Sequence, residues 1–249
     1  MGIAHKITAA ASRALEGALD AVFPRTCPGC GRRPDLPGRH ICGACMGRLM
    51  GESLDGPVCE ACGAPVKTAT ADGLCHECRR RRPRFDAARS ALAYMSLPRS
   101  LVHDFKYHGG LWLAEDLTDI LEACVRARLD ARAIDAVLPV PLHPAKFVLR
   151  NYNQSAILAK KLAMRLGLPY LGMSVSRRRD TPTQTHLAPR GRRKNVRGAF
   201  AVDRPEAIRS RTLLVVDDVM TTGATLGEIA GVLKKSGAWR VLAVTLCRA

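Results

Sequence analysis

The feature that most limits what this chain can fold into is a set of eight cysteines arranged as four Cys-x-x-Cys pairs near its N-terminus. The pairs begin at Cys27, Cys42, Cys59 and Cys75, and "CPGCG" is followed thirty-two residues later by the similar "CEACG". The region is therefore an internal repeat of one small unit. Because it contains few large apolar side chains, it could not bury a sufficient core without metal.

Two such pairs complete a tetrahedral Zn²⁺ site that has no open position for substrate. Disulfides are the competing interpretation, but no secretory signal precedes the cysteines, and four repeated pairs are unusual for a disulfide framework. A redox role is weaker still, since thioredoxin-type motifs occur singly. The repeat favours sequential pairing over an interleaved arrangement. The predicted ligands of two structural zinc ions are Cys27, Cys30, Cys42 and Cys45 in the first site and Cys59, Cys62, Cys75 and Cys78 in the second.

The remaining candidate ligands lie outside these quartets. His40 and His76 adjoin cysteines, but each quartet is already full, so we expect neither histidine to bind metal. Cys124 falls in an expected helix and Cys247 in an expected strand. Both are therefore predicted to be inert core residues.

The N-terminal segment, residues 1–24, has apolar residues at helical spacing and is predicted to be an amphipathic docking helix. Its Glu16 and Asp20 argue against a transit peptide, and it lacks the apolar core of a signal peptide. The longest apolar runs of the chain are far shorter than the ~20 residues that span a bilayer. These features favour a cytoplasmic protein.

The chain is strongly basic, with 39 Lys and Arg against 22 Asp and Glu, a formal net charge of +17. Two four-thiolate zinc sites would lower this to about +13. Such a charge favours phosphate-bearing partners, either nucleotides or nucleic acid. The compositional alternative stays open, because Arg outnumbers Lys 30 to 9, as a G+C-rich genome alone would produce.

After residue 83 the sequence alternates between strand and helix patterns. Alternation of this kind predicts a parallel sheet with helices on both faces. We expect strands at 87–95, 134–142, 168–175, 211–219 and 239–249, and helices at 98–109, 113–129, 153–167 and 225–237. The polar, basic segment 177–200 is too long for an ordinary connection, so it is interpreted as a lid or binding loop, or as disordered.

The stretch "LLVVDDVMTTGATL", Leu213 to Leu226, places two acids at the end of a buried strand. Open α/β sheets bind their ligands at this carboxyl end. The Thr/Gly-rich turn that follows precedes a helix, and its backbone N–H groups and hydroxyls form a cradle for phosphate. Acids at one end and a phosphate cradle at the other suit a sugar phosphate. An N-terminal threonine cap with the acids in salt bridges would explain one threonine but not the paired carboxylates.

This stretch resembles the signature of the type I phosphoribosyltransferases, which bind 5-phosphoribosyl-1-pyrophosphate. The resemblance implies that Asp217 and Asp218 hold the ribose hydroxyls and that Mg²⁺ is held mainly by substrate oxygens. It also implies a binding turn for the 5′-phosphate, made of Thr221, Thr222, Gly223, Ala224 and Thr225.

A broader resemblance covers nearly the whole chain. The paired cysteines, "FKYHG", "PVPLHPAKFVLRNYNQ", "RDTPTQTHL", "RRKNVRGAF" and the signature occur in the order typical of the ComF family, whose bacterial members are linked to DNA uptake in competence. In that resemblance Lys146 and Arg150 are cations for the leaving pyrophosphate. Asn151 replaces the family's usual glycine, and we expect it to occupy a left-handed turn position without damage.

Residues 181–198 resemble the flexible catalytic loop of that family. Cations of this segment could close over the pyrophosphate, and Lys106 could reach it from the sheet side. The loop cations are Arg190, Arg192, Arg193, Lys194 and Arg197, of which Arg193 is the candidate catalytic residue beside Asp217, Asp218 and Lys146.

The combined prediction is an α/β protein: a parallel-sheet type I phosphoribosyltransferase domain at 84–249, preceded by a small double zinc ribbon domain at 25–83. Two functions remain open. The first is a phosphoribosyltransferase whose acceptor would be recognised by residues 84–130 or by the ribbons, since no C-terminal hood follows the last strand. The second is a binding protein, either a sugar-phosphate or nucleotide sensor or a single-stranded DNA module, with a competence DNA translocase or helicase as candidate partner. With 4% aromatic residues, the chain offers few stacking platforms for DNA.

Overall fold

The computed structural model describes residues 24–52, 56–66, 72–181 and 189–249, without the side chains of 189, 190, 192 and 193. The chain divides into two compact units, Met1–Gly51 and Glu52–Ala249. Residues 1–23 of the N-terminal helix predicted at 1–24 lie outside the described residues. No helix in the described part of the chain is long and apolar enough to cross a membrane.

The described part of the first unit is organised around the first cysteine quartet. After the cysteine turns comes α2 (Gly43–Gly51), which buries Cys45 and Leu49. The Asp35 carboxylate accepts a hydrogen bond from the backbone N–H of Gly43 at 2.7 Å. A carboxylate at this end of a helix satisfies a backbone donor that the helix itself leaves unpaired.

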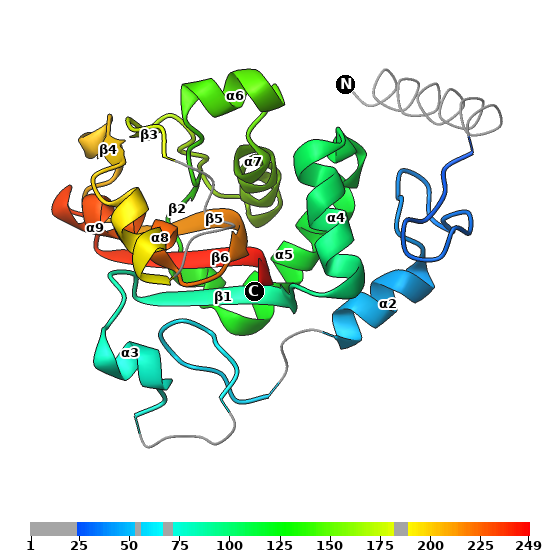
Figure 1. Ribbon diagram of the computed structural model, residues 1–249, viewed down its shortest axis with the longest axis horizontal. Coiled ribbons are helices and arrows are strands. Elements are labelled where there is room, and N and C mark those ends of the chain that lie inside the picture. Colours follow the sequence, from blue (N-terminus) through cyan, green and yellow to red (C-terminus); the bar gives the residue numbers. More distant parts are fainter. Residues whose placement is uncertain (1–23, 53–55, 67–71, 182–188) are drawn as a thin grey trace. The chain divides into compact units, whose positions relative to one another are not determined.

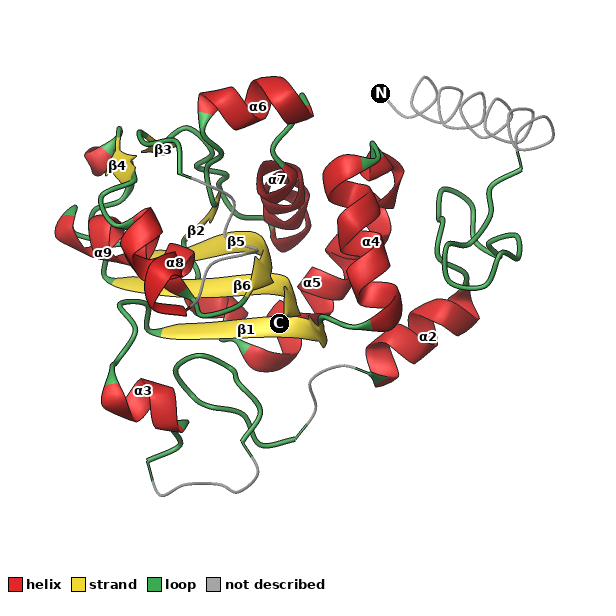
Figure 2. Cartoon of the chain, in the orientation of Figure 1, coloured by secondary structure: helices red, strands yellow, loops and turns green. Residues whose placement is uncertain are grey.

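The second unit is built on a four-stranded sheet in the order β1-β6-β5-β2, with all neighbouring strands parallel (Figures 1 and 2). The strands are β1 (Ala87–Ala93), β2 (Ala136–Pro139), β5 (Thr212–Met220) and β6 (Arg240–Arg248). Continuous apolar runs in β5 and β6 are buried on both faces, as parallel strands require. The predicted parallel α/β fold is confirmed.

Helices cover both faces of this sheet. Leu213 and Val215 of β5 pack into a core with Leu226 and Ile229 of α9 (Ala224–Lys235). The residues that alternate with them in β5 are also buried and point to the opposite face. On that side α5 (Ala114–Arg128) and α7 (Gln154–Leu166) pack against each other and against the sheet.

The other elements are short and lie mostly in the connections. α4 (Ser96–Tyr107) follows β1 and leads into the 3-10 turn η1 (Gly110–Leu113). α6 (Pro144–Arg150) lies between β2 and α7. The remaining elements are α3 (His76–Arg80), η2 (Ala131–Ala133), β3 (Val175–Arg177), α8 (Pro189–Val196), β4 (Phe200–Val202) and η4 (Pro205–Ala207).

The strand predicted at 168–175 is wrong in extent. Within that range the chain makes only one bridge to the sheet, Tyr170 opposite Val137, and a separate strand, β3, begins at Val175. Pro169 has no N–H to donate, although its carbonyl accepts from the Val137 backbone at 2.9 Å. A proline at the sheet edge therefore limits the pairing to a short contact.

The basic segment 177–200 is also more ordered than a single long loop. It contains α8, and β4 starts at Phe200, where it pairs with β3 in a two-stranded antiparallel sheet. Residues 182–188 of this segment lie outside the described part. The prediction missed β4 because three-residue strands carry too little alternation to be recognised.

The second cysteine quartet belongs to the α/β unit. Cys59, Cys62 and Cys78 are members of the same buried cluster as Phe85 and Leu226. The division between the compact units falls between the two ribbons, at Gly51 and Glu52.

Candidate functional site

Each cysteine quartet gathers four sulfur atoms around one point. In both groups the Sγ atoms all lie within 4.8 Å of one another, and the groups are formed by sequential pairs. The Sγ atoms of Cys30 and Cys42 are 3.6 Å apart, and those of Cys62 and Cys75 are 3.8 Å apart. Four converging thiol sulfurs are the donor set of a structural zinc site, so the residues fit the predicted metal.

The other two cysteines are buried core residues, as predicted. Burial raises the pKa of Cys124 to about 11 and that of Cys247 to about 12. Both thiols are therefore neutral near pH 7, and a neutral thiol is a poor nucleophile.

The paired acids lie at the carboxyl end of β5, as the sequence predicted. Asp218 is buried and forms an ion pair with the Lys106 ammonium, 2.9 Å from its Oδ1. Asp217 accepts a hydrogen bond of 2.9 Å from the Ser155 hydroxyl at the start of α7. Each acid is thus held by a side chain that comes from a helix beside the sheet.

The two acids differ in their electrostatic surroundings. Burial, followed by the charge of neighbouring Asp218, raises the pKa of Asp217 to about 7. Burial alone would lower the pKa of Lys106, but the Asp218 carboxylate outweighs that effect and the pKa lies above its usual value. Lys106 therefore stays charged beside the acids, whereas Asp217 can exchange a proton near neutral pH.

The turn after the acids leads directly into α9. Gly223 has φ +69° and is the N-cap of α9, so the turn bends sharply into the helix. A residue with a side chain would be strained at that angle. The Thr222 hydroxyl is buried without a hydrogen-bond partner among the described residues. Because the N-cap is a glycine, the simple alternative of a threonine capping the helix does not apply here, and a phosphate could satisfy these donors.

The predicted cations come from separate elements. Lys146 on α6 donates to the Thr181 carbonyl at 2.5 Å, and Arg150 at the end of α6 stacks over the Tyr107 ring at 4.9 Å. Lys106 lies on the last turn of α4, beside the acids. Arg193 is part of α8, but its side chain lies outside the described residues.

Arg177 at the end of β3 was not among the predicted site residues. Its guanidinium donates to the Thr181 hydroxyl and lies over the Phe200 ring at 5.5 Å. Its Nε is buried without a partner in the part of the chain that the structure describes. Burial lowers the pKa of Arg177, and the nearby Asp217 and Asp180 charges only partly oppose this effect.

Arg177, Lys146 and Arg150 form one cationic cluster. Burial lowers the pKa of Lys146, and the charges of Arg177 and Arg150 lower it further, while the Asp180 carboxylate, 3.9 Å from the Lys146 ammonium, partly opposes them. Two exposed neighbours, Arg178 and Arg179, make contacts elsewhere, Arg178 with Asp203 at 2.6 Å. The sequence signal was available in "VSRRR", since alternation along a strand turns the first arginine inward and the second outward.

The "RNYNQ" motif fixes the surroundings of the acids. Tyr152 donates through its hydroxyl to the Phe105 carbonyl at 2.8 Å, and Gln154 donates through Nε2 to the Lys106 carbonyl at 3.1 Å. The motif therefore holds the end of α4, which carries Lys106. Asn151 has φ +61° at the end of α6, which confirms the predicted left-handed turn position.

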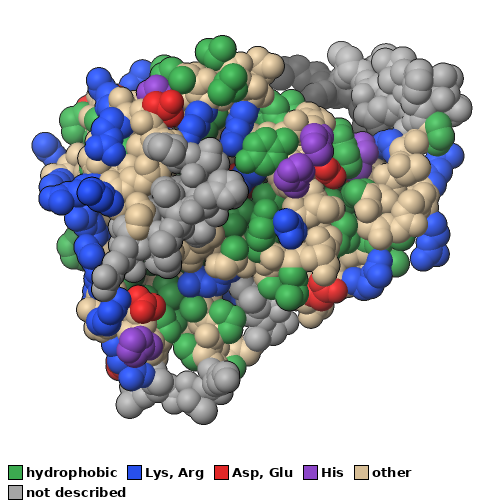
Figure 3. Space-filling model, viewed as in Figure 1, with side chains coloured by type: hydrophobic (Ala, Val, Ile, Leu, Met, Phe, Trp, Pro, Cys, Tyr) green, Lys and Arg blue, Asp and Glu red, His purple; other side chains and the backbone are tan. Residues whose placement is uncertain are grey.

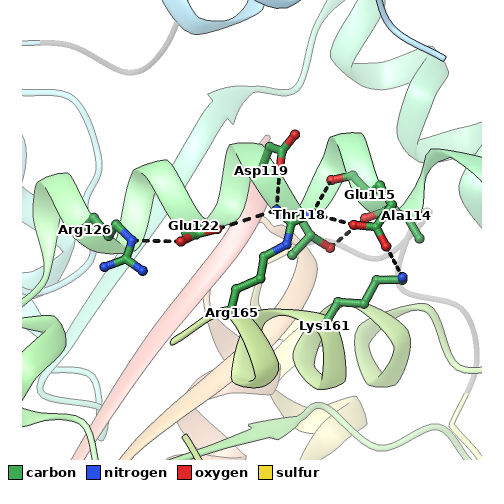
Figure 4. Close-up of polar contacts among 8 residues, drawn as sticks. All are labelled: Ala114, Glu115, Thr118, Asp119, Glu122, Arg126, Lys161 and Arg165. Atoms are coloured by element: carbon green, nitrogen blue, oxygen red, sulfur yellow. Dashed lines mark hydrogen bonds and ion pairs between the residues drawn. The ribbon is translucent and has the colours of Figure 1, made fainter. Parts of the chain in front are cut away.

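A network of charges joins α5 to α7 (Figure 4). Lys161 pairs with Glu115, and Arg165 pairs with Glu115 and Asp119. Arg165 also lies 3.5 Å from Glu122. Pairs that are partly exposed contribute little individually, but the network fixes α7, which carries Ser155 and Gln154 into the site.

Fold and site define the class of protein: a phosphoribosyltransferase-type domain joined to a double zinc ribbon. Residues 18–82 match the double zinc ribbon domain family, and residues 153–249 match the phosphoribosyl transferase domain family. The chain is 32% identical over 198 residues to competence protein F of Haemophilus influenzae, covering 78% of this chain and 85% of that protein. It is 31% identical over 211 residues to the DNA utilization protein YhgH of Salmonella typhimurium, covering 84% and 90%. The chain belongs to the ComF family.

Solved structures with matching regions include two phosphoribosyltransferases. The purine enzyme from Pyrococcus horikoshii is 17% identical, with a TM-score of 0.35, and covers 55% of this chain and 83% of that chain. The orotate enzyme from Aeropyrum pernix is 23% identical, with a TM-score of 0.32, and covers 62% and 66%. The family assignment rests on the sequence relatives and not on these alignments.

Proposed function

We propose that the protein binds 5-phosphoribosyl-1-pyrophosphate together with Mg²⁺ at the carboxyl end of β5. The observation that carries this proposal is the acid pair Asp217 and Asp218, followed directly by an uncapped turn into α9. The acids would accept hydrogen bonds from the ribose hydroxyls, and the turn at Thr221–Thr225 would hold the 5′-phosphate. Lys146, Arg150 and Arg177 would face the pyrophosphate.

Mg²⁺ fits this arrangement as an ion held mainly by the substrate. Asp218 is already paired with Lys106, and Asp217 already accepts from Ser155, so neither carboxylate is a free dedicated ligand. Mg²⁺ commonly combines one or two carboxylates with substrate phosphates. When bound, the ion would neutralise part of the pyrophosphate charge.

Transfer from this donor requires little covalent chemistry from the protein. The C1–pyrophosphate bond breaks through an oxocarbenium-like state, so the protein must stabilise the departing anion and exclude water. The cluster of Lys146, Arg150 and Arg177 would stabilise the departing anion. Arg193 on α8 is proposed as a further cation for the same anion. The reaction class is transfer of a pentosyl group to an acceptor.

Donor binding should depend on Arg177 and not on its neighbour. The wild type is expected to bind 5-phosphoribosyl-1-pyrophosphate in calorimetry with Mg²⁺ present. Arg177→Gln should weaken that binding at least about tenfold, because a charged hydrogen bond contributes about 1.5–3 kcal/mol. Binding of ribose 5-phosphate, which lacks the pyrophosphate, should change little.

Arg178→Gln is the matched control, since Arg178 is exposed and paired with Asp203. It should bind the donor as the wild type does. Equal losses in both variants would show a general charge effect and remove Arg177 from the site. The wild type is then incubated with donor, Mg²⁺ and a panel of bases, and pyrophosphate release is measured. Release would indicate an enzyme, and binding without release would indicate a sensor.

Single-stranded DNA is a second candidate ligand, favoured by the names of the relatives, which refer to competence and DNA utilization. Figure 3 shows Lys and Arg side chains gathered along the side that carries β4, α8 and α9. Exposed arginines there and at the linker include Arg81, Arg82, Arg179 and Arg197. A DNA translocase or helicase would be a partner of this second function.

DNA binding, if it uses these arginines, should depend steeply on salt. The logarithm of affinity is expected to fall with the logarithm of salt concentration, with a slope of roughly −0.7 per phosphate contacted. Fluorescence anisotropy with a labelled oligonucleotide measures it. No binding at low salt, with donor binding intact, would leave these arginines as solvated surface.

A further inference from the structure

The two zinc ribbons are alike in sequence but belong to different compact units. The second ribbon has no separate core, because Ala61, Leu74 and Cys62 lie in one buried cluster with Met220 and Leu226. The last two residues flank the turn at Thr221–Thr225, which is called the phosphate turn below. The backbone N–H of Ala88 in β1 donates to the Ala61 carbonyl at 2.8 Å. The ribbon and the sheet therefore form one packed body.

One side chain links this ribbon to the end of the sheet. The Arg248 guanidinium donates to the Cys62 carbonyl at 2.7 Å, and its second nitrogen lies 3.6 Å from the Cys62 sulfur. Arg248 ends β6, where it is the register partner of Met220 in β5. The backbone N–H of Ala249 also donates to the Met220 carbonyl at 3.1 Å.

Met220 is the last residue before the phosphate turn, so the contacts run from the metal ligand to the site. A metal at the second quartet fixes Cys62, and Cys62 fixes Arg248 at the end of β6. Arg248 and Ala249 then hold the end of β5, two residues beyond Asp218. Phe85, from the segment joining the ribbon to β1, supports the turn itself, since a Cβ on Gly223 would lie 3.4 Å from its ring.

We propose that Arg248 is a positioning residue that couples the second zinc site to the donor site. The expected effect of Arg248 on zinc binding does not depend on the proposed function, whereas its expected effect on donor binding rests on that function. Hydrogen bonds to metal ligands orient them and stabilise the bound metal. Because coupling between two binding sites is reciprocal, the donor should also stabilise zinc in the second quartet.

The first quartet supplies a matched control. Arg48 donates to the Cys45 sulfur at 2.9 Å, so it contacts a ligand of the first zinc as Arg248 contacts one of the second. It belongs to the other compact unit. Removing it should therefore loosen zinc without changing the donor site.

The test uses the full chain with both zinc ions bound. Zinc release to a chromogenic chelator is followed with and without 5-phosphoribosyl-1-pyrophosphate, and donor affinity is measured by calorimetry. Arg248→Gln should speed one of two release phases about tenfold and weaken donor binding by a similar factor. Saturating donor should slow that same phase in the wild type. Arg48→Gln should speed the other phase and leave donor affinity unchanged.

Arg248→Lys keeps a cation at this place and should recover part of both effects, which a merely misfolded variant would not. Unchanged donor affinity in Arg248→Gln, in a wild type that binds donor, would overturn the coupling. Unchanged zinc release would overturn the contact with the metal site. A wild type that binds no donor would overturn the proposed function instead, and the release rates would still decide the zinc half.

Discussion

Replacing Asp217 and Asp218 together by Asn is expected to abolish binding of the phosphoribosyl donor while the protein stays folded. Each carboxylate is positioned to accept a charged hydrogen bond, which contributes about 1.5–3 kcal/mol. Losing both should raise Kd at least about a hundredfold. Calorimetry with Mg²⁺ measures the affinity, and circular dichroism with a thermal melt checks the fold.

The fold should survive because Asn has nearly the same shape as Asp. After Asp217→Asn the amide oxygen could still accept the hydrogen bond that Ser155 donates, and the change removes a buried acid whose pKa burial raises to about 7. Lys106 does lose its ionic partner, so a modest fall in Tm is expected. Donor affinity equal to that of the wild type would show that the ligand binds elsewhere.

The raised pKa of Asp217 adds a pH dependence to the same measurement. The ionised form accepts hydrogen bonds from ribose hydroxyls more strongly than the protonated form does. Donor affinity should therefore rise as the pH rises through about 7, and Asp217→Asn should remove that part of the rise. An unchanged pH profile in this variant would assign the titration to another group.

The parts of the fold that were predictable from sequence are those in which burial is nearly complete. β5 and β6 contain apolar runs typical of strands buried on both faces, and the acids lie within β5 near its carboxyl end. The segment 168–175 looked similar, but Pro169 removes a donor and the chain makes only a short edge contact. Apolar composition alone does not distinguish these cases.

The candidate site was predictable where its residues are adjacent in sequence and not where they are brought together by folding. The acids and the turn form one stretch, so one motif identified them. Arg177 joins the cluster because β3 turns it inward beside α6. The alternation in "VSRRR" could have indicated this only if a strand had been predicted at Val175–Arg177, and the prediction ended the strand at residue 175. Lys106 was expected to reach the pyrophosphate from the sheet side, and this stays a prediction; its ammonium lies beside Asp218, since its helix ends there.

The assignment of the two ribbons to different compact units could not be read from the repeat. Similar cysteine spacing says that both units bind metal, but it says nothing about the surface on which each one packs. Small residues make the packing of the second ribbon possible: Gly63 has φ +67°, and a Cβ there would lie 2.5 Å from the Ala88 carbonyl oxygen. A glycine also occupies the matching position of the first ribbon, so this signal does not distinguish the two units.

That difference leads to a large expected effect on stability. The purified wild type should contain about two zinc ions per chain, because both quartets are complete. Changing Cys59 and Cys62 to Ser should reduce the count to about one and lower the Tm of the main unfolding transition by more than about 10 °C. Structural zinc contributes about 10 kcal/mol or more in small zinc domains, which is comparable to the whole stability of a domain. Donor binding should be lost with it.

Changing Cys27 and Cys30 to Ser is the matched experiment on the first ribbon. It should also remove one zinc ion, yet leave the main transition within about 2 °C of the wild type, because the first quartet contributes to a different compact unit. Equal losses of Tm in the two variants would mean that the ribbons act as one structural domain. A zinc count of zero in a fully folded wild type would show that neither quartet needs zinc for the protein to fold. The expected asymmetry follows from one fact: the cysteines of the second quartet share a buried core with the sheet that carries Asp217 and Asp218. Their metal should therefore stabilise the proposed donor site as well as the ribbon.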